Sequence, residues 1–301
     1  MNKNYLTEII CILLSVLILC SCAGNKDKPE QDMADQTETL VKTLDFDGKE
    51  MDYFRFGKQD GRKLVILPGL SLKSVMGSAE AVVAAYGILA EEYDIYLFDH
   101  IRKEPDGYSI EHMADDTVSA IKKLELDRVS IIGVSLGGMI GETIAIRYPD
   151  LVEGLIVCSS TSRITDSERA IFETWKKLAL DRDTDKLMES FGEHVYSPSF
   201  YEQYKDIIIA SGQGADEDDF HNFIISTDAI LNFNIYDQLD RISCPVFVIG
   251  AGKDKALGVQ ASYDIADKLK CEYYIYDDYG HGAYDEAPDY LARVKGFLDK
   301  Q

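Results

Sequence analysis

The sequence has few basic residues, and this scarcity limits the partners that the protein can have. Its 31 lysines and arginines are outnumbered by 53 aspartates and glutamates, so the formal net charge is −22 over 301 residues. No long run of lysine or arginine occurs, and the acidic residues are spread along the chain. Such a surface repels nucleic acid and anionic lipid headgroups. We therefore expect no nucleic-acid partner and no basic patch that binds a membrane.

Sequence patterns typical of bound metals and nucleotides are also missing. No pair of histidines has the spacing that places two metal ligands on one face of a helix, and no Cys-x-x-Cys pair occurs. Neither the phosphate-binding pattern G-x-x-x-x-G-K-[ST] nor the dinucleotide-binding pattern G-x-G-x-x-G is found. We therefore expect no metal and no nucleotide cofactor.

A serine between two glycines provides the clearest sign of chemistry. Residues 133–137 read Gly-Val-Ser-Leu-Gly; the apolar stretch before them predicts a buried strand, and the spacing of residues 138–147 predicts a helix. A strand that runs into a helix through a one-residue turn holds Ser135 in a strained conformation, and only glycine fits beside it. We predict that Ser135 is a nucleophile; the alternative is a purely structural turn.

A serine hydroxyl needs a base that accepts its proton, and the base needs a carboxylate that orients it. Residues 246–250 predict a buried strand, and Asp254 lies in the loop that follows it. Residues 271–276 predict the last strand, after which His281 stands between two glycines in what we expect to be a tight, exposed loop. The chain order Ser135, Asp254, His281 is the order found in α/β hydrolases.

On these residues the chain resembles the α/β-hydrolase superfamily, particularly its single-domain members with a helical cap. The resemblance runs from about residue 43 to the C-terminus and depends on residues 133–138, on 242–250 leading to Asp254, and on 280–288. It implies a mostly parallel eight-stranded sheet with helices on both faces. The core would comprise residues 43–160 and 243–301, with the cap or lid at 161–242.

The resemblance also implies an oxyanion hole made by two backbone amides, those of Leu70 and Leu136. Many relatives have His-Gly after the third strand, whereas this chain has Leu-Pro-Gly-Leu at residues 67–70. Proline removes one donor at position 68 but leaves the amide of Leu70 available. The alternative is that Pro-Gly only turns the chain between a strand and a helix.

Other polar residues receive ordinary structural interpretations. Asp99 and His100 follow the predicted strand 93–98, and we expect Asp99 to cap a turn there. His112, His194 and His221 are expected to be surface or helix residues.

The segment from Thr161 to Arg241 is too long for a loop and contains helical stretches at 168–178 and 200–208. In relatives such an insertion covers the nucleophile and shapes the substrate pocket. Trp175 and Phe172 are candidates for the pocket wall; further aromatic candidates are Phe191, Phe223 and Phe233. The alternative is that these side chains fill the interior of the cap itself.

Three cysteines lie beyond residue 22, an odd number that cannot all pair within one chain. Cys244 and Cys271 would begin two strands that are neighbours in the family's sheet, so a disulfide between them is conceivable. The simpler interpretation is that Cys158, Cys244 and Cys271 are buried free thiols.

The first residues resemble a bacterial lipoprotein signal. A weakly basic start precedes the apolar run from Ile9 to Leu19, which is too short to span a bilayer and suits the core of a signal peptide. The run ends in Leu-x-Ser-Cys, so we expect residues 1–21 to be removed and Cys22 to be acylated and to attach the protein to the bilayer. Residues 22–42 would form a flexible tether. Simple secretion and a retained signal anchor are the alternatives.

Taken together, the sequence predicts a lipid-anchored serine hydrolase of the bacterial cell envelope that cleaves carboxylic esters of a small-molecule acyl substrate without a cofactor. Thioester, amide, lactone and carbon–carbon bond hydrolysis remain alternatives, as does a non-catalytic binding lipoprotein of the same fold. The oligomeric state is not predicted by the sequence.

Overall fold

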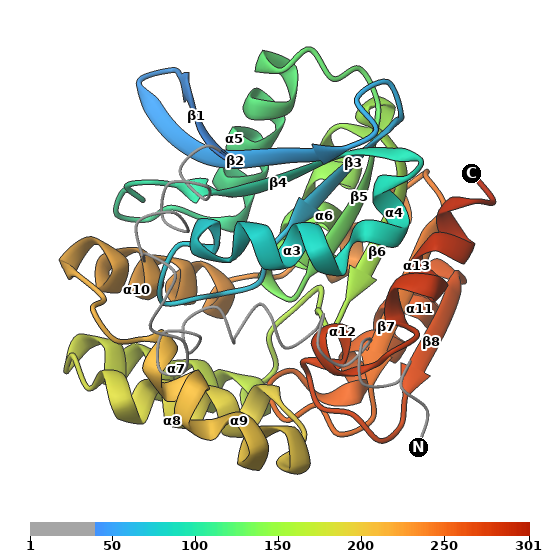
Figure 1. Ribbon diagram of the computed structural model, residues 1–301. Coiled ribbons are helices and arrows are strands. Elements are labelled where there is room, and N and C mark those ends of the chain that lie inside the picture. The colour runs from blue at the N-terminus through green and yellow to red at the C-terminus, as the bar shows by residue number, and fades with distance from the viewer. Residues whose placement is uncertain (1–39) are drawn as a thin grey trace, which may run out of the picture.

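The computed structural model describes residues 40–301. The expected signal peptide, Cys22 and most of the expected tether lie outside the described residues. A single eight-stranded sheet forms the centre of the molecule (Figure 1). Its strands are β1 Val41–Phe46, β2 Lys49–Gly57, β3 Arg62–Leu67, β4 Tyr93–Ile101, β5 Val129–Val134, β6 Val152–Cys158, β7 Val246–Ala251 and β8 Glu272–Tyr276.

The strand order is β1-β2-β4-β3-β5-β6-β7-β8. The first two pairings, β1 with β2 and β2 with β4, are antiparallel, and all later pairings are parallel. Strands β5 and β7 are buried along their whole length, which is why they are continuous apolar runs rather than alternating ones. The predicted mostly parallel eight-stranded sheet is confirmed.

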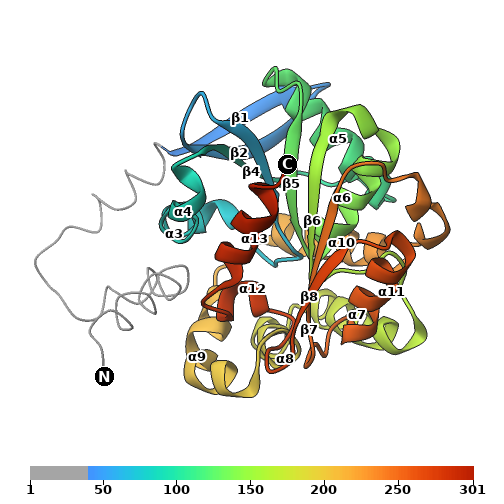
Figure 2. The ribbon, with the colours of Figure 1, turned by 90° about the vertical axis from the view of Figure 1, so that its right-hand side faces the viewer.

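Helices cover both faces of the sheet (Figure 2). One face carries α5 Ile110–Lys123, α6 Leu136–Arg147 and α11 Gly258–Leu269; the other carries α3 Ala79–Ala85, α4 Gly87–Ala90, α12 Ala283–Glu286 and α13 Tyr290–Leu298. Because successive side chains of a strand point to opposite faces, Ile131 belongs to the core beneath α6 and Ile132 to the core beneath α13. Short 3-10 helices lie at Val75–Ser78, Pro149–Leu151 and Tyr236–Arg241.

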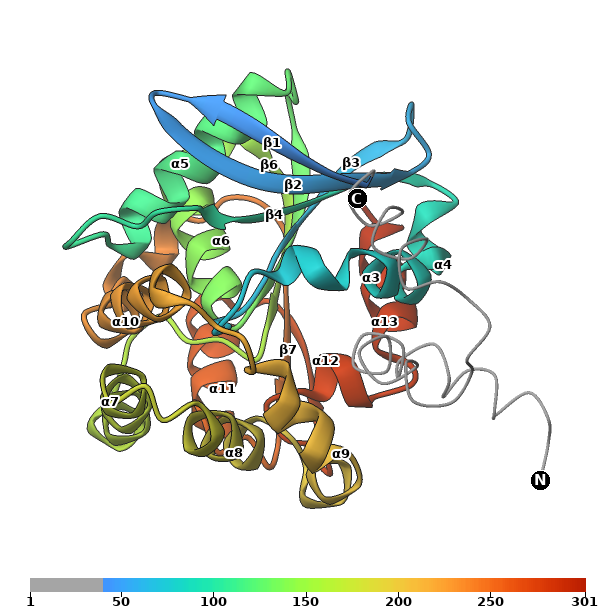
Figure 3. The same ribbon diagram turned by 60° about the vertical axis from the view of Figure 1, so that its left-hand side comes forward.

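The cap is formed by the four α-helices between β6 and β7, and it lies beyond the carboxyl ends of the strands (Figure 3). They are α7 Asp166–Leu180, α8 Thr184–Val195, α9 Pro198–Ser211 and α10 Glu217–Leu231. Side chains at the N-caps start all four: Thr165 shares a capping box with Glu168, and Asp183, Ser197 and Asp216 accept bonds from backbone amides of the first turn. The predicted helical insertion is therefore present.

Two of the boundaries that differ from the sequence prediction lie near Ser135 or at the end of β4. Strand β4 continues to Ile101, because its last residue pairs with Met51 of β2 in the antiparallel part of the sheet. Asp99 therefore lies within a strand and does not cap a turn. Helix α6 begins at Leu136, directly after Ser135, and not at residue 138.

Cys244 and Cys271 form no disulfide and are half-buried, whereas Cys158 is a buried thiol. Glu272, the first residue of β8, pairs with Phe247; Cys271 precedes this pair, and Cys244 precedes the first residue of β7. Among residues 40–301, no helix combines the length and the apolar character needed to cross a membrane.

Candidate active site

Ser135 occupies a strained turn between β5 and α6. Its backbone angles are φ 52° and ψ −115°, which a residue with a side chain adopts only where its surroundings enforce it. A Cβ atom at Gly133 would lie 2.4 Å from the carbonyl oxygen of Gly137, and a Cβ atom at Gly137 would lie 2.0 Å from that of Leu67. The two glycines therefore allow the strand and the helix to meet closely enough to hold Ser135 in this turn.

His281 and Asp254 form a buried pair beyond the carboxyl ends of β8 and β7. The Nδ1 atom of His281 lies 2.8 Å from Oδ2 of Asp254, and the two side chains are 4% and 3% exposed. The other carboxylate oxygen of Asp254 accepts the backbone amides of Ala256 at 2.8 Å and Leu257 at 2.9 Å.

Burial alone would raise the pKa of the Asp254 carboxyl, but the attraction of His281 and the hydrogen bonds from the ring and the two amides outweigh it. The net pKa is below its ordinary value, so the group is ionised at neutral pH. An ionised acceptor places the proton of the neutral imidazole on Nδ1. The lone pair is then on Nε2, the nitrogen that a nucleophile would have to approach.

Ser135 is brought to the same edge of the sheet, since β5, β7 and β8 are parallel and all three residues follow carboxyl ends. The hydrogen bond between His281 and Asp254 is present. Within residues 40–301 the Ser135 hydroxyl makes no hydrogen bond, so none joins it to His281. Catalytic hydrogen bonds of this kind are often long before substrate binds.

Two backbone amides adjoin Ser135. Leu136 is the first residue of α6, and its amide has no partner within the helix. A Cβ atom at Gly69 would lie 3.2 Å from Cβ of Ser135, so the Pro-Gly turn passes directly beside the serine and Leu70 follows it. In the described part of the chain the Leu70 amide donates to no other group. Both predicted oxyanion donors are therefore available near the hydroxyl.

A family model described as alpha/beta hydrolase fold matches residues 64–288. The chain belongs to this family. Its similarity to solved structures, although below 25% identity, shows the same fold: an α/β hydrolase from a deep-sea metagenome aligns over 86% of this chain and 98% of its own with a TM-score of 0.78 and 18% identity. An enol-lactonase of Burkholderia xenovorans aligns over 86% of this chain and 100% of its own, with a TM-score of 0.73 and 18% identity.

Curated relatives of this α/β hydrolase carry names from more than one reaction. A protein of Stutzerimonas stutzeri named "Putative carbamate hydrolase RutD" is 27% identical over 225 residues, which is 69% of this chain and 82% of the relative. The 3-oxoadipate enol-lactonase 2 of Acinetobacter baylyi is 21% identical over 217 residues, which is 70% of this chain and 79% of the relative. The chain is therefore an α/β hydrolase, and its substrate is a separate question.

The expectation that His281 lies in an exposed loop is wrong, because the cap of this α/β hydrolase packs against that loop. His281 is 3% exposed. A Cβ atom at Gly280 or Gly282 would lie 2.8 Å from atoms of Tyr196, and the Gly282 amide donates to the carbonyl of Val195 at 2.7 Å. The two glycines thus permit close contact between the histidine loop and the cap.

Side-chain hydrogen bonds reinforce this contact, and sequence reasoning missed them. The Tyr196 hydroxyl donates to Asp285 at 3.3 Å, and both the amide and the hydroxyl of Ser197 donate to Glu286, at 2.8 and 2.5 Å. The acidic pair so soon after His281 was a usable signal. Its partners in the cap could not be identified without the fold.

Trp175 and Phe172, the predicted pocket wall, lie in the interior of the cap. Each is 2% exposed, and their rings meet edge to face at 5.2 Å. The Trp175 ring also contacts Phe191 at 4.9 Å, and its indole N–H donates to Ser190 at 3.1 Å. These contacts are those of a helix-packing core, the alternative that the sequence left open.

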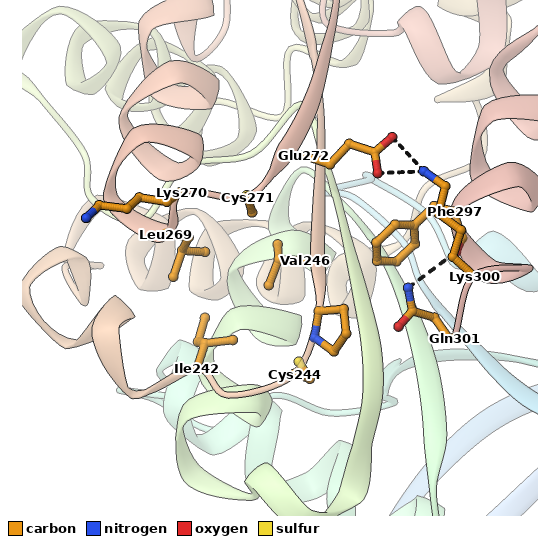
Figure 4. A pocket seen from close by; sticks show the side chains of 11 residues that line it. Ile242, Cys244, Val246, Leu269, Lys270, Cys271, Glu272, Phe297, Lys300 and Gln301 are labelled. Carbon is orange, nitrogen blue, oxygen red and sulfur yellow. Dashed lines mark hydrogen bonds and ion pairs between the residues drawn. The ribbon is translucent and has the colours of Figure 1, made fainter.

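Two cavities bear on where a substrate could bind. One, of about 200 Å³, reaches Leu70, the residue after the turn beside Ser135, and Phe223 of α10 lies in its wall. The other, of about 380 Å³, lies at the amino ends of β7 and β8, where Cys244 and Cys271 are (Figure 4). Since Asp254 and His281 follow the carboxyl ends of the same strands, the larger cavity is at the opposite edge from the site.

Residues 40–301 contain no cluster of three or more side chains suited to hold a metal.

Proposed function

We propose that this α/β hydrolase cleaves carboxylic esters through an acyl-enzyme formed on Ser135. The observation that carries the proposal is the buried hydrogen bond between His281 and Asp254 at the strand edge where Ser135 occupies its strained turn. A base that is already oriented by an ionised carboxylate is what activates a serine hydroxyl.

In the proposed reaction the Ser135 oxygen attacks the ester carbonyl carbon, and its proton moves to Nε2 of His281. Asp254 stabilises the imidazolium that forms, and the amides of Leu70 and Leu136 stabilise the negative charge on the carbonyl oxygen. The C–O bond to the alcohol then breaks, and His281 gives its proton to the departing oxygen. Water, deprotonated by His281, attacks the acyl-enzyme and releases the acid.

Relatives named as an enol-lactonase and a carbamate hydrolase support acyl transfer without fixing the bond. A lactone is a cyclic ester, and the same groups would open it, so lactone hydrolysis is the second candidate. A serine nucleophile does not fit the haloalkane and epoxide hydrolases of this fold, which use aspartate.

A fluorophosphonate probe tests the proposal. We expect one equivalent to label Ser135 and short p-nitrophenyl esters to slow the labelling by competing for the site. The Ser135→Ala protein is the matched control and should not label. A folded parent protein that neither labels nor hydrolyses any ester would favour a non-catalytic binding protein of this fold.

We also propose that the mature chain is attached to a membrane of the bacterial cell envelope through lipid on Cys22. The support is the sequence alone: an apolar run from Ile9 to Leu19 followed by Leu-x-Ser-Cys. More than one acyl chain on a single residue gives stable attachment, whereas one chain holds only marginally.

Metabolic labelling with a palmitate analogue tests the lipid site. We expect Cys22→Ser to abolish the label and leave an unprocessed precursor, and Cys20→Ser, the matched control, to change little. Label that persists in the Cys22→Ser protein would refute the site.

A further inference from the structure

The cavity beside Leu70 is rich in carboxylates. It lies between residues 70–74, the carboxyl end of β4 and helix α10. The acidic residues in its wall are Asp52, Asp99, Glu104, Asp216, Asp218 and Asp219, whereas its only basic residues are Lys73 and Arg102. Arg102 is already paired with Asp52, at 2.9 Å, and Lys73 donates to a backbone carbonyl. The negative charge of this wall is therefore not neutralised by the wall itself.

Two of these acids have only uncharged partners: Glu104 is buried and Asp99 is partly buried. Glu104 is 1% exposed, and both of its oxygens accept from the Ser226 hydroxyl at 2.9 Å. Asp99 accepts from the Ser74 hydroxyl at 2.5 Å and from the amide of His100 at 2.8 Å. Neither acid forms a salt bridge within residues 40–301. Burying a carboxylate without a counter-charge is costly, and such groups concentrate at functional sites.

Burial raises the pKa of both carboxyls, that of Glu104 to about 8. A cation bound between them would lower both values and bring the pair into its ionised form.

A third observation concerns His100, which also lines this cavity. Its Nε2 atom is buried and has no hydrogen-bond partner in the described part of the chain. Buried polar atoms are rarely left without a partner, so this nitrogen indicates a group that is added when the site is filled. Burial lowers the pKa of the imidazole, and the neutral ring does not repel a cation.

We propose that this cavity binds a small positively charged group of the substrate, an ammonium or alkylammonium, and so selects cationic esters. The inference rests on the proposed ester hydrolysis and names its substrate class. The volume of the cavity, about 200 Å³, suits such a head group. Because the cavity begins at Leu70, a bound head group lies close to the proposed oxyanion donor.

Charge-matched substrate pairs test the inference. Acetylcholine is compared with its uncharged analogue, in which carbon replaces the quaternary nitrogen. A p-nitrophenyl ester of a trimethylammonio acid is compared with its carbon analogue in the same way. The two pairs place the charge on the leaving group and on the acyl group. We expect kcat/KM for the charged member of at least one pair to be higher by about tenfold.

Asp99→Asn and Glu104→Gln should each bring that ratio close to one while fluorophosphonate still labels Ser135. Asp150→Asn, which removes an exposed acid before the amino end of β6, is the matched control and should leave the ratio unchanged. Two acid variants are used so that failure of one to fold does not decide the outcome.

A ratio near one for both pairs in the parent protein, or an unchanged ratio in folded Asp99→Asn and Glu104→Gln, would overturn the inference while ester hydrolysis stands. If no ester is hydrolysed and Ser135 does not label, the proposed function fails instead. Thermal stabilisation by choline, compared with its carbon analogue, then reports on the cavity alone, because a ligand that binds the folded state raises the melting temperature. Equal effects of the two alcohols in that assay would also overturn the inference.

Discussion

At the scale of single residues, the geometry of the site is set by the residues that surround the reactive groups, not by the reactive groups themselves. Ser135 is strained because glycines at 133 and 137 let the strand and helix approach, and Asp254 is ionised because two amides and His281 face it. The glycine spacing was visible in the sequence, since only glycine tolerates such contacts. The burial of His281 was not visible, because it depends on a cap segment about eighty residues earlier in the chain.

The proposed roles of the three residues predict unequal losses. Ser135→Ala and His281→Ala should each reduce kcat for a p-nitrophenyl ester by ~10⁶, because the groups act as one unit. Asp254→Asn should cost about 10⁴, since the geometry survives but the imidazole tautomer is wrong. Steady-state kinetics on proteins with unchanged circular dichroism check this. Full activity in the His281→Ala protein would remove His281 from the mechanism.

The close approach at Gly137 predicts a strong effect of a single methyl group. In Gly137→Ala the new Cβ would lie 2.0 Å from a backbone oxygen of Leu67, so the turn must shift. We expect a loss of about 1–3 kcal/mol in the free energy of unfolding, together with loss of probe labelling at Ser135.

Gly296 in α13 is the matched control, because nothing lies within 4 Å of its added Cβ. Gly296→Ala should be neutral or stabilise by about 0.4–1 kcal/mol. Urea denaturation measures both variants. Equal changes in the free energy of unfolding for Gly137→Ala and Gly296→Ala would show that the structure relieves the contact between the new Cβ and Leu67 without loss of stability.

At the scale of elements, the sequence predicts the position of a helix or strand best where all residues of the segment are equally buried. Strands β5 and β7 are buried on both faces, and their apolar runs locate them closely. The end of β4 was misplaced, because the polar residues Asp99 and His100 lie at an irregularity in the pairing with β2, and the strand resumes at Ile101, which pairs with Met51. For the cap, length and periodicity predicted helices; which aromatic side chains face the cavity depends on how the helices pack together.

The packing of Trp175 predicts a structural role for this residue. Trp175→Ala should lower the free energy of unfolding by about 3–5 kcal/mol, because it empties the space between α7 and α8. We expect kcat/KM to fall by the same factor for acetyl to decanoyl esters. Leu180→Ala, in the same helix but 56% exposed, is the control and should change stability little. A shift in chain-length preference with unchanged stability would place Trp175 in the substrate pocket.

At the scale of the whole molecule, acidic groups shape stability from inside as well as outside. The surface carries most of a net charge of −22, which favours expansion as pH rises. In the interior, burial raises the pKa of Glu142 and of Glu104 to about 8 and that of Asp285 to about 7. Repulsion between surface charges and ionisation of these buried carboxyls both lower the free energy of unfolding as pH rises above 5.

Glu142 allows the interior contribution to be measured. Its side chain is completely buried in α6, and among residues 40–301 it is bound only by the Ser162 hydroxyl, at 2.9 and 3.0 Å. Because its pKa is raised on folding, the folded protein binds more protons than the unfolded chain between the ordinary glutamate pKa and about 8. The stability it provides is complete below that window and is lost as pH rises through it. The carboxyls of Asp94 and Asp254, whose pKa values are lowered, act only at more acidic pH.

We therefore expect the free energy of unfolding of the parent protein to fall between pH 5 and pH 9, with Glu142 contributing up to about 1.4 kcal/mol per pH unit. His100, whose pKa is lowered by burial, acts in the opposite direction below the ordinary histidine pKa, but the buried acids outnumber it. Glu142→Gln keeps the bond to Ser162 but cannot ionise, so its slope should be shallower and its advantage should grow with pH. Glu91→Gln removes the same charge from an exposed position and controls for surface repulsion. Urea denaturation at fixed ionic strength across this range gives the three slopes. Parallel slopes for Glu142→Gln and the parent would mean that Glu142 does not titrate in this window and that surface charge alone sets the pH dependence.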